Sequence, residues 1–238
     1  TILFTPHPVF AVNPILYDKL PFNEKDFQPV ALVSQASHVL LANLTLPATR
    51  ITDVIALAKA KPRSINFGSG GQGTSLHLAG ELLNYQNKIE LVHVPYRGSA
   101  PAVTDVATGA VTMSFSSLAA SLSLIQDGRI RAVAVTSKER MPQLPDVAPL
   151  SEGAPGLKGY ELLNWFGLFG TAGTPPAIIN RLNEVTTKAL AEPKTAEILR
   201  NQGIVPQPMT PAEYKAFVEA ETKKFAGIIE RANIRLEN

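Results

Sequence analysis

The stretch that decides the fold is Gly68-Ser69-Gly70-Gly71-Gln72-Gly73-Thr74-Ser75. It follows a short β-like run at residues 64–67 and precedes a helix-like run at residues 76–85. Glycine lets the backbone turn sharply, and the first N–H groups of the following helix have no partner inside the helix. A helix N-terminus also carries the positive end of the helix dipole. The stretch therefore predicts a strand–turn–helix unit whose amides and hydroxyls form a cradle for an anion.

The same arrangement returns twice further along the chain. The strand-like residues 91–94 lead into Gly98 and Ser99, and residues 112–115 lead into Ser116, each time before a helix-like run. In an open α/β sheet, the carboxyl ends of such strands line one crevice. Neutral donors dominate there, without paired carboxylates or a general base, which favours reversible capture of a small anion over catalysis. The candidate ligand-binding residues at these strand ends are Ser69, Gly70, Gly73, Thr74, Ser75, Gly98, Ser99, Ala100 and Ser116.

Short apolar runs alternate with helical patterns along most of the chain, which is typical of βαβ units and a largely parallel α/β sheet. The expected strands are residues 1–5, 27–33, 37–43, 64–67, 91–94, 112–115, 131–136 and 165–169. The expected helices are residues 13–19, 51–61, 75–85, 100–108, 118–127, 176–190, 194–202 and 211–232. The last helix has a capping box, with Thr210 at its start and Glu213 three residues later.

Composition excludes several classes of function. The chain has 238 residues, 45% of them hydrophobic and 18% charged, and a net charge of +2, which argues against nucleic acid or an anionic membrane as partner. It has no cysteine, so thiol catalysis, disulfides and thiolate metal sites are excluded. Two charge-free stretches, 106–126 and 162–180, contain many serines, glycines or prolines, so each is expected to be a strand, a turn and a helix rather than a membrane span.

The glycine stretch also matches nucleotide motifs, and these leave one alternative open. Gly68, Gly70 and Gly73 have the spacing of a dinucleotide fingerprint, but no acidic residue ends the next strand. Arg97 at that place suits a 2′-phosphate, so an NADP-binding oxidoreductase lobe remains possible. A P-loop would need a lysine that is missing here. The remaining alternative is a glycine-rich turn without a ligand, and the four histidines, which do not cluster along the sequence, are expected to be structural hydrogen-bonders.

Distinctive motifs occur along the whole chain. They are Asn13-Pro14-x-Leu16-Tyr17-x-Lys19-Leu20-Pro21, Gly70-x-x-Gly73-Thr74-Ser75-x-His77-Leu78-Ala79-Gly80-Glu81, His93-Val94-Pro95-Tyr96-Arg97-Gly98-Ser99-Ala100-Pro101-Ala102, Ile130-Arg131-Ala132-Val133-Ala134-Val135-Thr136-Ser137, Leu144-Pro145-Asp146-Val147, Trp165-Phe166-Gly167-Leu168 and Gly173-Thr174-Pro175. Together they resemble the motifs of the substrate-binding proteins of tripartite tricarboxylate transporters, the Bug-type periplasmic receptors.

The resemblance implies a type II periplasmic binding protein fold, in which two α/β lobes joined by a hinge close on a ligand like a Venus flytrap. Lobe 1 would comprise residues 1–37 and 163–238, and lobe 2 residues 38–162. The function implied is an extracytoplasmic receptor, not an enzyme, with no cofactor or metal. It would capture a small organic carboxylate in the interlobe cleft and deliver it to membrane transporter subunits from the periplasm.

The chain departs from the family pattern in three places. The family has two further strand–helix units before the position of Thr1, so lobe 1 is expected to lack these units and the ligand contacts of their loop. Ser116 stands where the family commonly has Asp, and Phe10 where it has small or hydroxylated residues. Phe10 either forms an apolar wall for an aromatic or longer aliphatic acid, or packs beneath the helix at Asn13. Trp165 is expected at the cleft floor or hinge. Besides the solute receptor and the NADP-binding lobe, a ligand-free sensor or interaction domain is a third alternative for the function.

Overall fold

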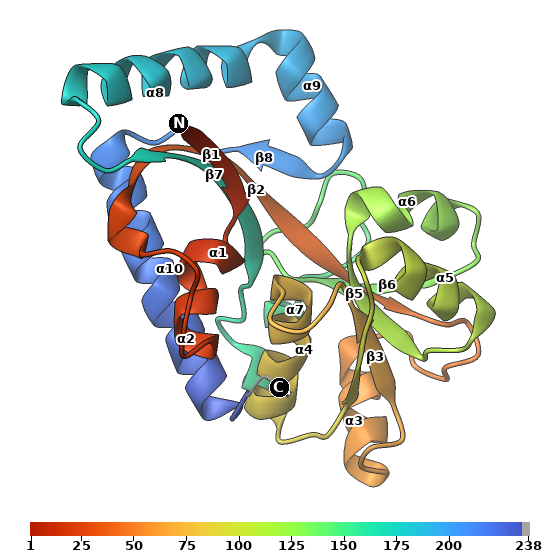
Figure 1. Ribbon diagram of the computed structural model, residues 1–238. Helices are drawn as coiled ribbons and strands as arrows, with labels where there is room; N and C mark the ends of the chain where they lie inside the picture. The colour runs from red at the N-terminus through yellow and green to blue at the C-terminus, as the bar shows by residue number, and fades with distance from the viewer. Residues whose placement is uncertain (235–238) are drawn as a thin grey trace. The chain divides into compact units, whose positions relative to one another are not determined.

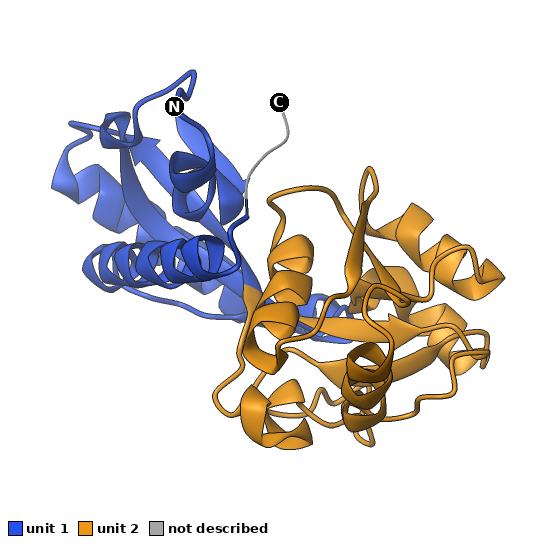
Figure 2. Cartoon of the chain, turned by 90° about the horizontal axis from the view of Figure 1, so that it is seen from below, with its two compact units in different colours: residues 1–36, 164–238 blue, residues 37–163 orange. Residues whose placement is uncertain are grey.

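The computed structural model describes residues 1–234. The chain forms two compact units (Figure 2): unit 1 is Thr1–Ala36 with Asn164–Asn238, and unit 2 is Ser37–Leu163. Strand β2 (Phe27–Ala42) runs from unit 1 into unit 2, so each unit contains one end of this strand.

Unit 2 is an α/β unit with a mixed sheet (Figure 1). Strand β3 pairs in parallel with β4 and β5, while the second half of β2 pairs antiparallel with β5 and β6. The parallel strands alternate with helices along the chain, as the sequence predicted, but the expectation of a largely parallel sheet was wrong, because β2 pairs antiparallel with its neighbours β5 and β6. In unit 2 the strands after β2 are β3 (Asn66–Ser69), β4 (Val92–Pro95), β5 (Met113–Ser117) and β6 (Arg131–Val135), and the helices are α3 (Ile51–Ala60), α4 (Ser75–Asn87), α5 (Ser99–Thr108), α6 (Leu118–Gln126), α7 (Leu150–Gly153) and the 3-10 helix η2 (Pro155–Leu157).

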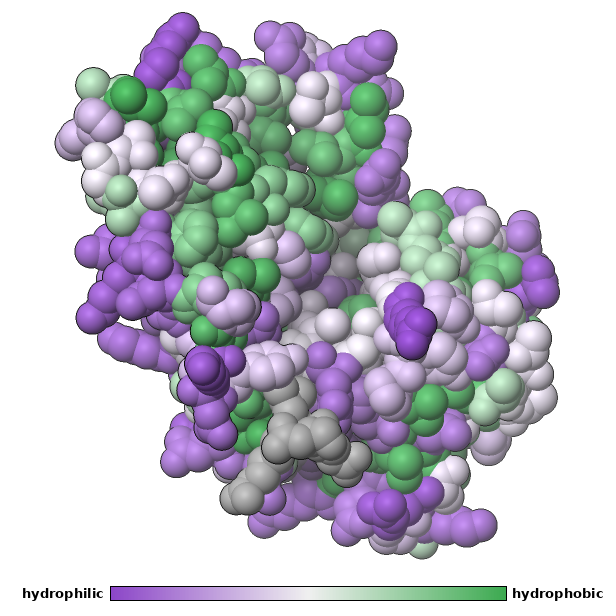
Figure 3. Space-filling model, in the orientation of Figure 1, coloured by the Kyte–Doolittle hydropathy of each residue, from purple (hydrophilic) through white to green (hydrophobic). Residues whose placement is uncertain are grey.

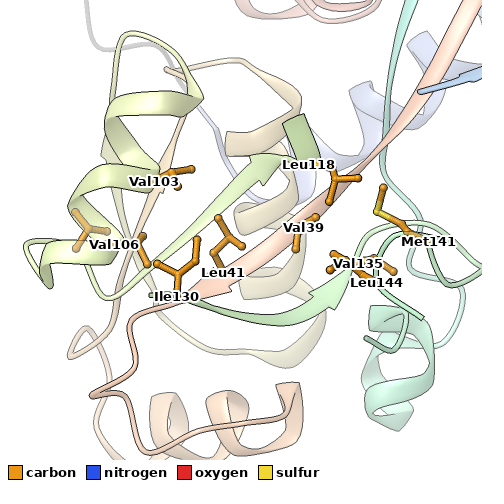
Figure 4. Close-up of a cluster of buried hydrophobic side chains, with 10 residues drawn as sticks. Val39, Leu41, Val103, Val106, Leu118, Ile130, Val135, Met141 and Leu144 are labelled. Atoms are coloured by element: carbon orange, nitrogen blue, oxygen red, sulfur yellow. The ribbon is translucent and has the colours of Figure 1, made fainter. Parts of the chain in front are cut away.

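Helices α4 and α5 cover opposite faces of this sheet. Consecutive residues of a strand point to opposite faces. An added Cβ at Gly80 of α4 would collide with the Phe67 ring, whereas an added Cβ at Gly68 would come 3.1 Å from Ala102 of α5. On the α5 face lies an apolar core of unit 2 (Figure 4), built from Val39, Leu41, Val103, Val106, Val111, Leu118, Ile130, Val135, Met141 and Leu144.

Unit 1 contains an antiparallel sheet with helices from both ends of the chain. Strand β1 (Ile2–Pro6) pairs with β7 (Leu163–Thr171), and the central part of β2 pairs with β8 (Ile204–Pro206). β1 is the edge strand, with Ile2 and Phe4 more than half exposed, at 52% and 58%. Figure 3 shows apolar side chains gathered on the face of unit 1 that is turned toward the viewer. Its helices are α1 (Pro8–Ala11), α2 (Asn13–Leu16), the 3-10 helix η1 (Glu24–Asp26), α8 (Pro176–Ala191), α9 (Pro193–Asn201) and α10 (Pro211–Arg231).

Several elements differ from the sequence prediction, and the short helices α1 and α7 were not expected. The two strands expected at residues 27–33 and 37–43 are one strand, β2, because the polar residues between them pair with β8: Ser34 with Pro206, Gln35 with Val205 and Ala36 with Ile204. β8 itself was not expected, since three residues are too few to show an alternating pattern. The helix expected at residues 13–19 already ends at Leu16, since Tyr17 is extended and the residues that follow are exposed.

The two charge-free stretches fold as expected. Residues 106–126 end in β5 and α6, and residues 162–180 contain β7 and the start of α8. In the part of the chain that the structure describes, none of the helices combines the length and the apolar character that crossing a bilayer requires.

Candidate functional site

The carboxyl ends of β3, β4 and β5 lie at the same edge of the sheet in unit 2. Parallel pairing places Ser69 beside Pro95 and Gly68 beside Ser114. Each strand then runs into a helix, β3 into α4, β4 into α5 and β5 into α6. Three helix N-termini therefore follow three adjacent strand ends, as the repeated strand–glycine–serine pattern indicates.

Two of the connecting loops are hydrogen-bonded to each other. The Tyr96 N–H donates to Ser69 O and the Gly98 N–H to Gly70 O, both at 3.2 Å. Three glycines of these loops have a positive φ, +128° at Gly71, +73° at Gly73 and +106° at Gly98, which side-chain-bearing residues rarely adopt. The β3–α4 loop (residues 70–74) and the β4–α5 loop (residues 96–98) thus form one connected rim at the sheet edge.

The N–H groups and hydroxyls of the β3–α4 loop are largely engaged within the protein. The Gly71 N–H donates to Ser69 Oγ at 3.1 Å, and the Thr74 hydroxyl donates to Gly71 O at 2.7 Å. Thr74 is also the N-cap of α4, since its Oγ1 accepts the His77 N–H. Ser69 and Ser75 are buried. The sequence placed these groups in an anion cradle, and the structure shows that several of them support the loop itself.

Three histidines that the sequence did not connect lie together behind this loop. His93 Nε2 is 2.7 Å from Ser69 Oγ, and His38 Nε2 is 2.8 Å from Ser75 Oγ. The rings of His77 and His93 stack with centroids 4.0 Å apart. Burial lowers the pKa of His38 to about 3 and of His93 to about 4. Burial and, second, the neighbouring His93 lower the pKa of His77 to about 3, so all three rings are neutral at pH 7.

A signal for His77 was present in the sequence. Counted from the N-cap Thr74, His77 is the third residue of α4, the position where a capping box carries Glu or Gln. The His77 ring reaches back in the same way, because its Nδ1 accepts the N–H of Gly73 at 3.2 Å. The sequence did not reveal the partner ring, because His93 comes from β4 and meets His77 only in the folded unit.

Helices α5 and α6 begin without a side-chain cap. Gly98 precedes α5, Ser117 precedes α6, and neither N-cap side chain accepts a hydrogen bond from its helix. Ser99 is half-buried and Ala100 exposed at the start of α5. Ser116, the residue before the N-cap of α6, is buried, and among the described residues its Oγ has no hydrogen-bond partner. A helix start whose N–H groups have no side-chain cap is a favourable position for a carboxylate or another small anion.

Phe10 and Trp165 lie in the interior of unit 1. Phe10 is 5% exposed and packs on Phe169, with ring centroids 4.1 Å apart, and on Phe22 and Phe27. Trp165 is fully buried against Tyr214 and Phe217. Both rings are covered by protein neighbours, and their contribution to ligand binding stays a prediction. No group of three acidic, histidine or cysteine side chains suited to a metal ion occurs within residues 1–234.

Comparisons with known proteins agree with the motifs. The family model of the tripartite tricarboxylate transporter family receptor (TctC) matches residues 1–234. The UPF0065 protein in the tcbD-tcbE intergenic region of Pseudomonas sp. (strain P51) is 38% identical over 219 residues, 92% of this chain and 65% of the relative. Bordetella pertussis protein BugT is 30% identical over 95% of this chain and 69% of its own length. This chain thus spans about two thirds of the length of these relatives.

Solved structures share the fold along nearly the whole chain. R. palustris Rpa4515, solved with adipate, has a TM-score of 0.89 at 31% identity, covering 98% of this chain and 78% of that chain. The periplasmic binding protein BugD has a TM-score of 0.85 at 27% identity, covering 99% of this chain and 79% of that chain. The fold is therefore that of the periplasmic binding proteins, as expected, and the chain belongs to the tripartite tricarboxylate transporter receptor family.

Proposed function

We propose that this chain is a solute receptor that binds a small organic carboxylate at the strand ends of unit 2. The observation that carries the proposal is the pair of helices, α5 and α6, that begin at one sheet edge without a side-chain cap. A carboxylate supplies the acceptors that these N–H groups lack, and the helix dipoles favour its charge. The solved relative with adipate, 31% identical to this chain, supports a carboxylate as the ligand.

In this proposal the residues of the site have two roles. The Ser99 and Ala100 N–H groups and the Ser99 hydroxyl bind the carboxylate, with Ser116 next to the start of α6. Gly70, Gly98 and Thr74 form the rim beside it. Ser69, Gly73 and Ser75, which are bonded to histidines, hold the loop in place. Neutral donors bind a carboxylate without a permanent ion pair, which keeps release accessible.

The remaining parts of the proposal follow from the family. Receptors of tripartite transporters work with membrane subunits, so we propose that this chain delivers its ligand to such subunits from the periplasm. Phe10 and Trp165 stay proposed ligand-side residues of lobe 1 (residues 1–37 and 163–238), and residues 38–162 stay the proposed second lobe. The adipate-bound relative favours an aliphatic dicarboxylate among the possible ligands.

No observation favours the two alternatives. A dinucleotide fingerprint needs free loop amides for the pyrophosphate. Here the Gly71 and Gly73 N–H groups are bonded to Ser69 and His77. Within residues 1–234, neither unit has a feature that indicates a ligand-free sensor domain.

Calorimetry with adipate tests the proposal, with NADP and the uncharged diamide of adipic acid as comparison ligands. Adipate is expected to bind, and the other two are not. Substitution of Ser99 by Pro removes the N–H at the first helical position, where proline is tolerated, whereas Ser99→Ala removes only the hydroxyl. A hydrogen bond to a charged group contributes about 1.5–3 kcal/mol, so S99P should weaken adipate binding about 10- to 100-fold relative to S99A.

Two results would contradict the proposal. One is the absence of heat with adipate and with a panel of other aliphatic and aromatic carboxylates. The other is equal adipate affinity of S99P and S99A, which would show that the start of α5 does not contact the ligand.

A further inference from the structure

Two histidines, the buried His77 and the half-buried His93, contact the two ends of the β3–α4 loop. His93 Nε2 lies 2.7 Å from Ser69 Oγ, at the last residue of β3. The Gly73 N–H, immediately before the N-cap of α4, donates to His77 Nδ1 at 3.2 Å. The two rings stack on each other at 4.0 Å with an interplanar angle of 26°. The stacked rings therefore connect the start of the loop to its end.

We propose that His77 and His93 are positioning residues, a neutral imidazole pair that keeps the β3–α4 loop in the shape that binds the ligand. This inference rests on the proposed function, because it assigns a role to residues behind the same site. Neither ring is assigned a contact with the ligand.

The hydrogen bond from Gly73 determines the tautomer of His77. A backbone N–H can only donate, so Nδ1 of His77 must be unprotonated. The ring proton is then on Nε2, which lies 3.7 Å from Glu81 Oε1 one turn further along α4. Protonation of Nδ1 would place two donors face to face and break the contact with Gly73.

His93 completes the connection on the other side of the loop. Ser69 Oγ, next to His93 Nε2, accepts the Gly71 N–H at 3.1 Å and lies 3.2 Å from Gly71 O. The Ser69 hydroxyl thus links the His93 ring to both the backbone N–H and the C=O of Gly71. Stacking disfavours charge on both rings at once, because two imidazolium ions at this separation repel each other. The contact with Gly73 requires an unprotonated Nδ1 on His77, and burial lowers the pKa of His93 to about 4, so a neutral pair satisfies both ends of the loop at pH 7.

The surroundings of the pair contain few groups that titrate. His77 faces Glu81 on its own helix and His93 from β4. His38 approaches from β2 through Ser75, and the Tyr160 hydroxyl donates to Ala79 O further along α4. Burial raises the pKa values of Glu81 and Tyr160, which disfavours the charged form of both groups.

Nuclear magnetic resonance of the histidine side chains tests the tautomer without any ligand. Long-range proton–nitrogen spectra at pH 7 should show His77 as the neutral ring with its proton on Nε2. A proton on Nδ1 of His77, or a charged ring, would overturn the inference.

Two substitutions separate the hydrogen bond from simple packing. His77→Asn keeps an acceptor, because its Oδ1 is as many bonds from Cβ as the histidine Nδ1, whereas His77→Leu fills the space without an acceptor. Hydrogen exchange of the Gly73 amide should become about five- to tenfold faster in H77L and stay within about twofold of the original in H77N. Adipate affinity should fall about tenfold in H77L and remain within about threefold in H77N.

The outcomes distinguish this inference from the proposed function. If the unsubstituted chain binds neither adipate nor any other carboxylate of the panel, the proposed function fails, whereas the tautomer and the Gly73 exchange still decide whether the histidines hold the loop. Equal Gly73 exchange in the original chain, H77N and H77L would overturn the positioning role. So would unchanged adipate affinity in H77L despite faster Gly73 exchange.

Discussion

Gly98 offers a direct test of how strictly the loops at the sheet edge depend on glycine. Its φ of +106° and ψ of 172° belong to a region that is essentially restricted to glycine. An added Cβ would meet no atom within 4 Å, so substitution by Ala changes backbone strain and not packing. Such strain costs about 1–3 kcal/mol, and the reduced freedom of the unfolded chain offsets about 0.4–1 kcal/mol of it. Gly98→Ala should therefore destabilise the protein by roughly 1–2 kcal/mol.

Gly227 in α10 provides the matched control. An added Cβ also meets nothing within 4 Å there, but the residue lies inside a helix without a positive φ. Gly227→Ala should stabilise the protein by about 0.5–1 kcal/mol. Thermal unfolding followed by circular dichroism should move the two midpoints in opposite directions, by about 2–4 °C per kcal/mol. If Gly98→Ala were as stable as the original chain, the loop would tolerate another backbone conformation, and the connected rim would not depend on it.

Two further predictions concern stability. The pKa of His38 and His77 is about 3 in the folded chain and near 6.5 when unfolded, so below pH 6.5 the unfolded chain binds more protons and stability falls. When the pH is lowered from 7.5 to 5, the free energy of unfolding measured with urea should fall by about 2 kcal/mol for each of these two rings. Glu81, whose pKa burial raises, partly offsets this loss. An unfolding free energy that stays constant over this pH range would contradict buried neutral histidines. Thr210→Ala removes the capping box of α10 and should lower the free energy of unfolding by about 1 kcal/mol, whereas Thr222→Ala inside the same helix should not. Equal unfolding midpoints for the two variants would contradict the stabilising role of the cap.

Local sequence patterns predicted most elements of the fold. Helix α3 begins at Ile51 and α8 at Pro176 as expected, and the capping box of Thr210 and Glu213 is present. The prediction was wrong for the central part of β2, because the residues Ser34-Gln35-Ala36 are polar or small and gave no strand pattern. These residues are extended because β8 pairs with them, and that partner lies about 170 residues further along the chain. A local pattern carries no information about such a distant strand.

In the candidate site, too, features set by neighbouring residues could be predicted, whereas contacts between distant residues could not. The strand ends and helix starts could be placed from glycine and serine positions, because these residues act through the backbone next to them. The role of the histidines could not be predicted in this way, since His77 is on a helix and His93 on a strand, and their contact depends on how α4 packs on β4. Burial of Ser69 and Ser75 was missed for the same reason.

The burial of Trp165 has a practical consequence for following the two units separately. It is the single tryptophan of the chain and lies fully buried in unit 1, so its fluorescence emission reports solvent entry into that unit alone. His38, His77 and His93 belong to unit 2, and their imidazole resonances provide an independent reporter there. Melting curves recorded with both signals would assign every stability change to one half of the molecule without any added label.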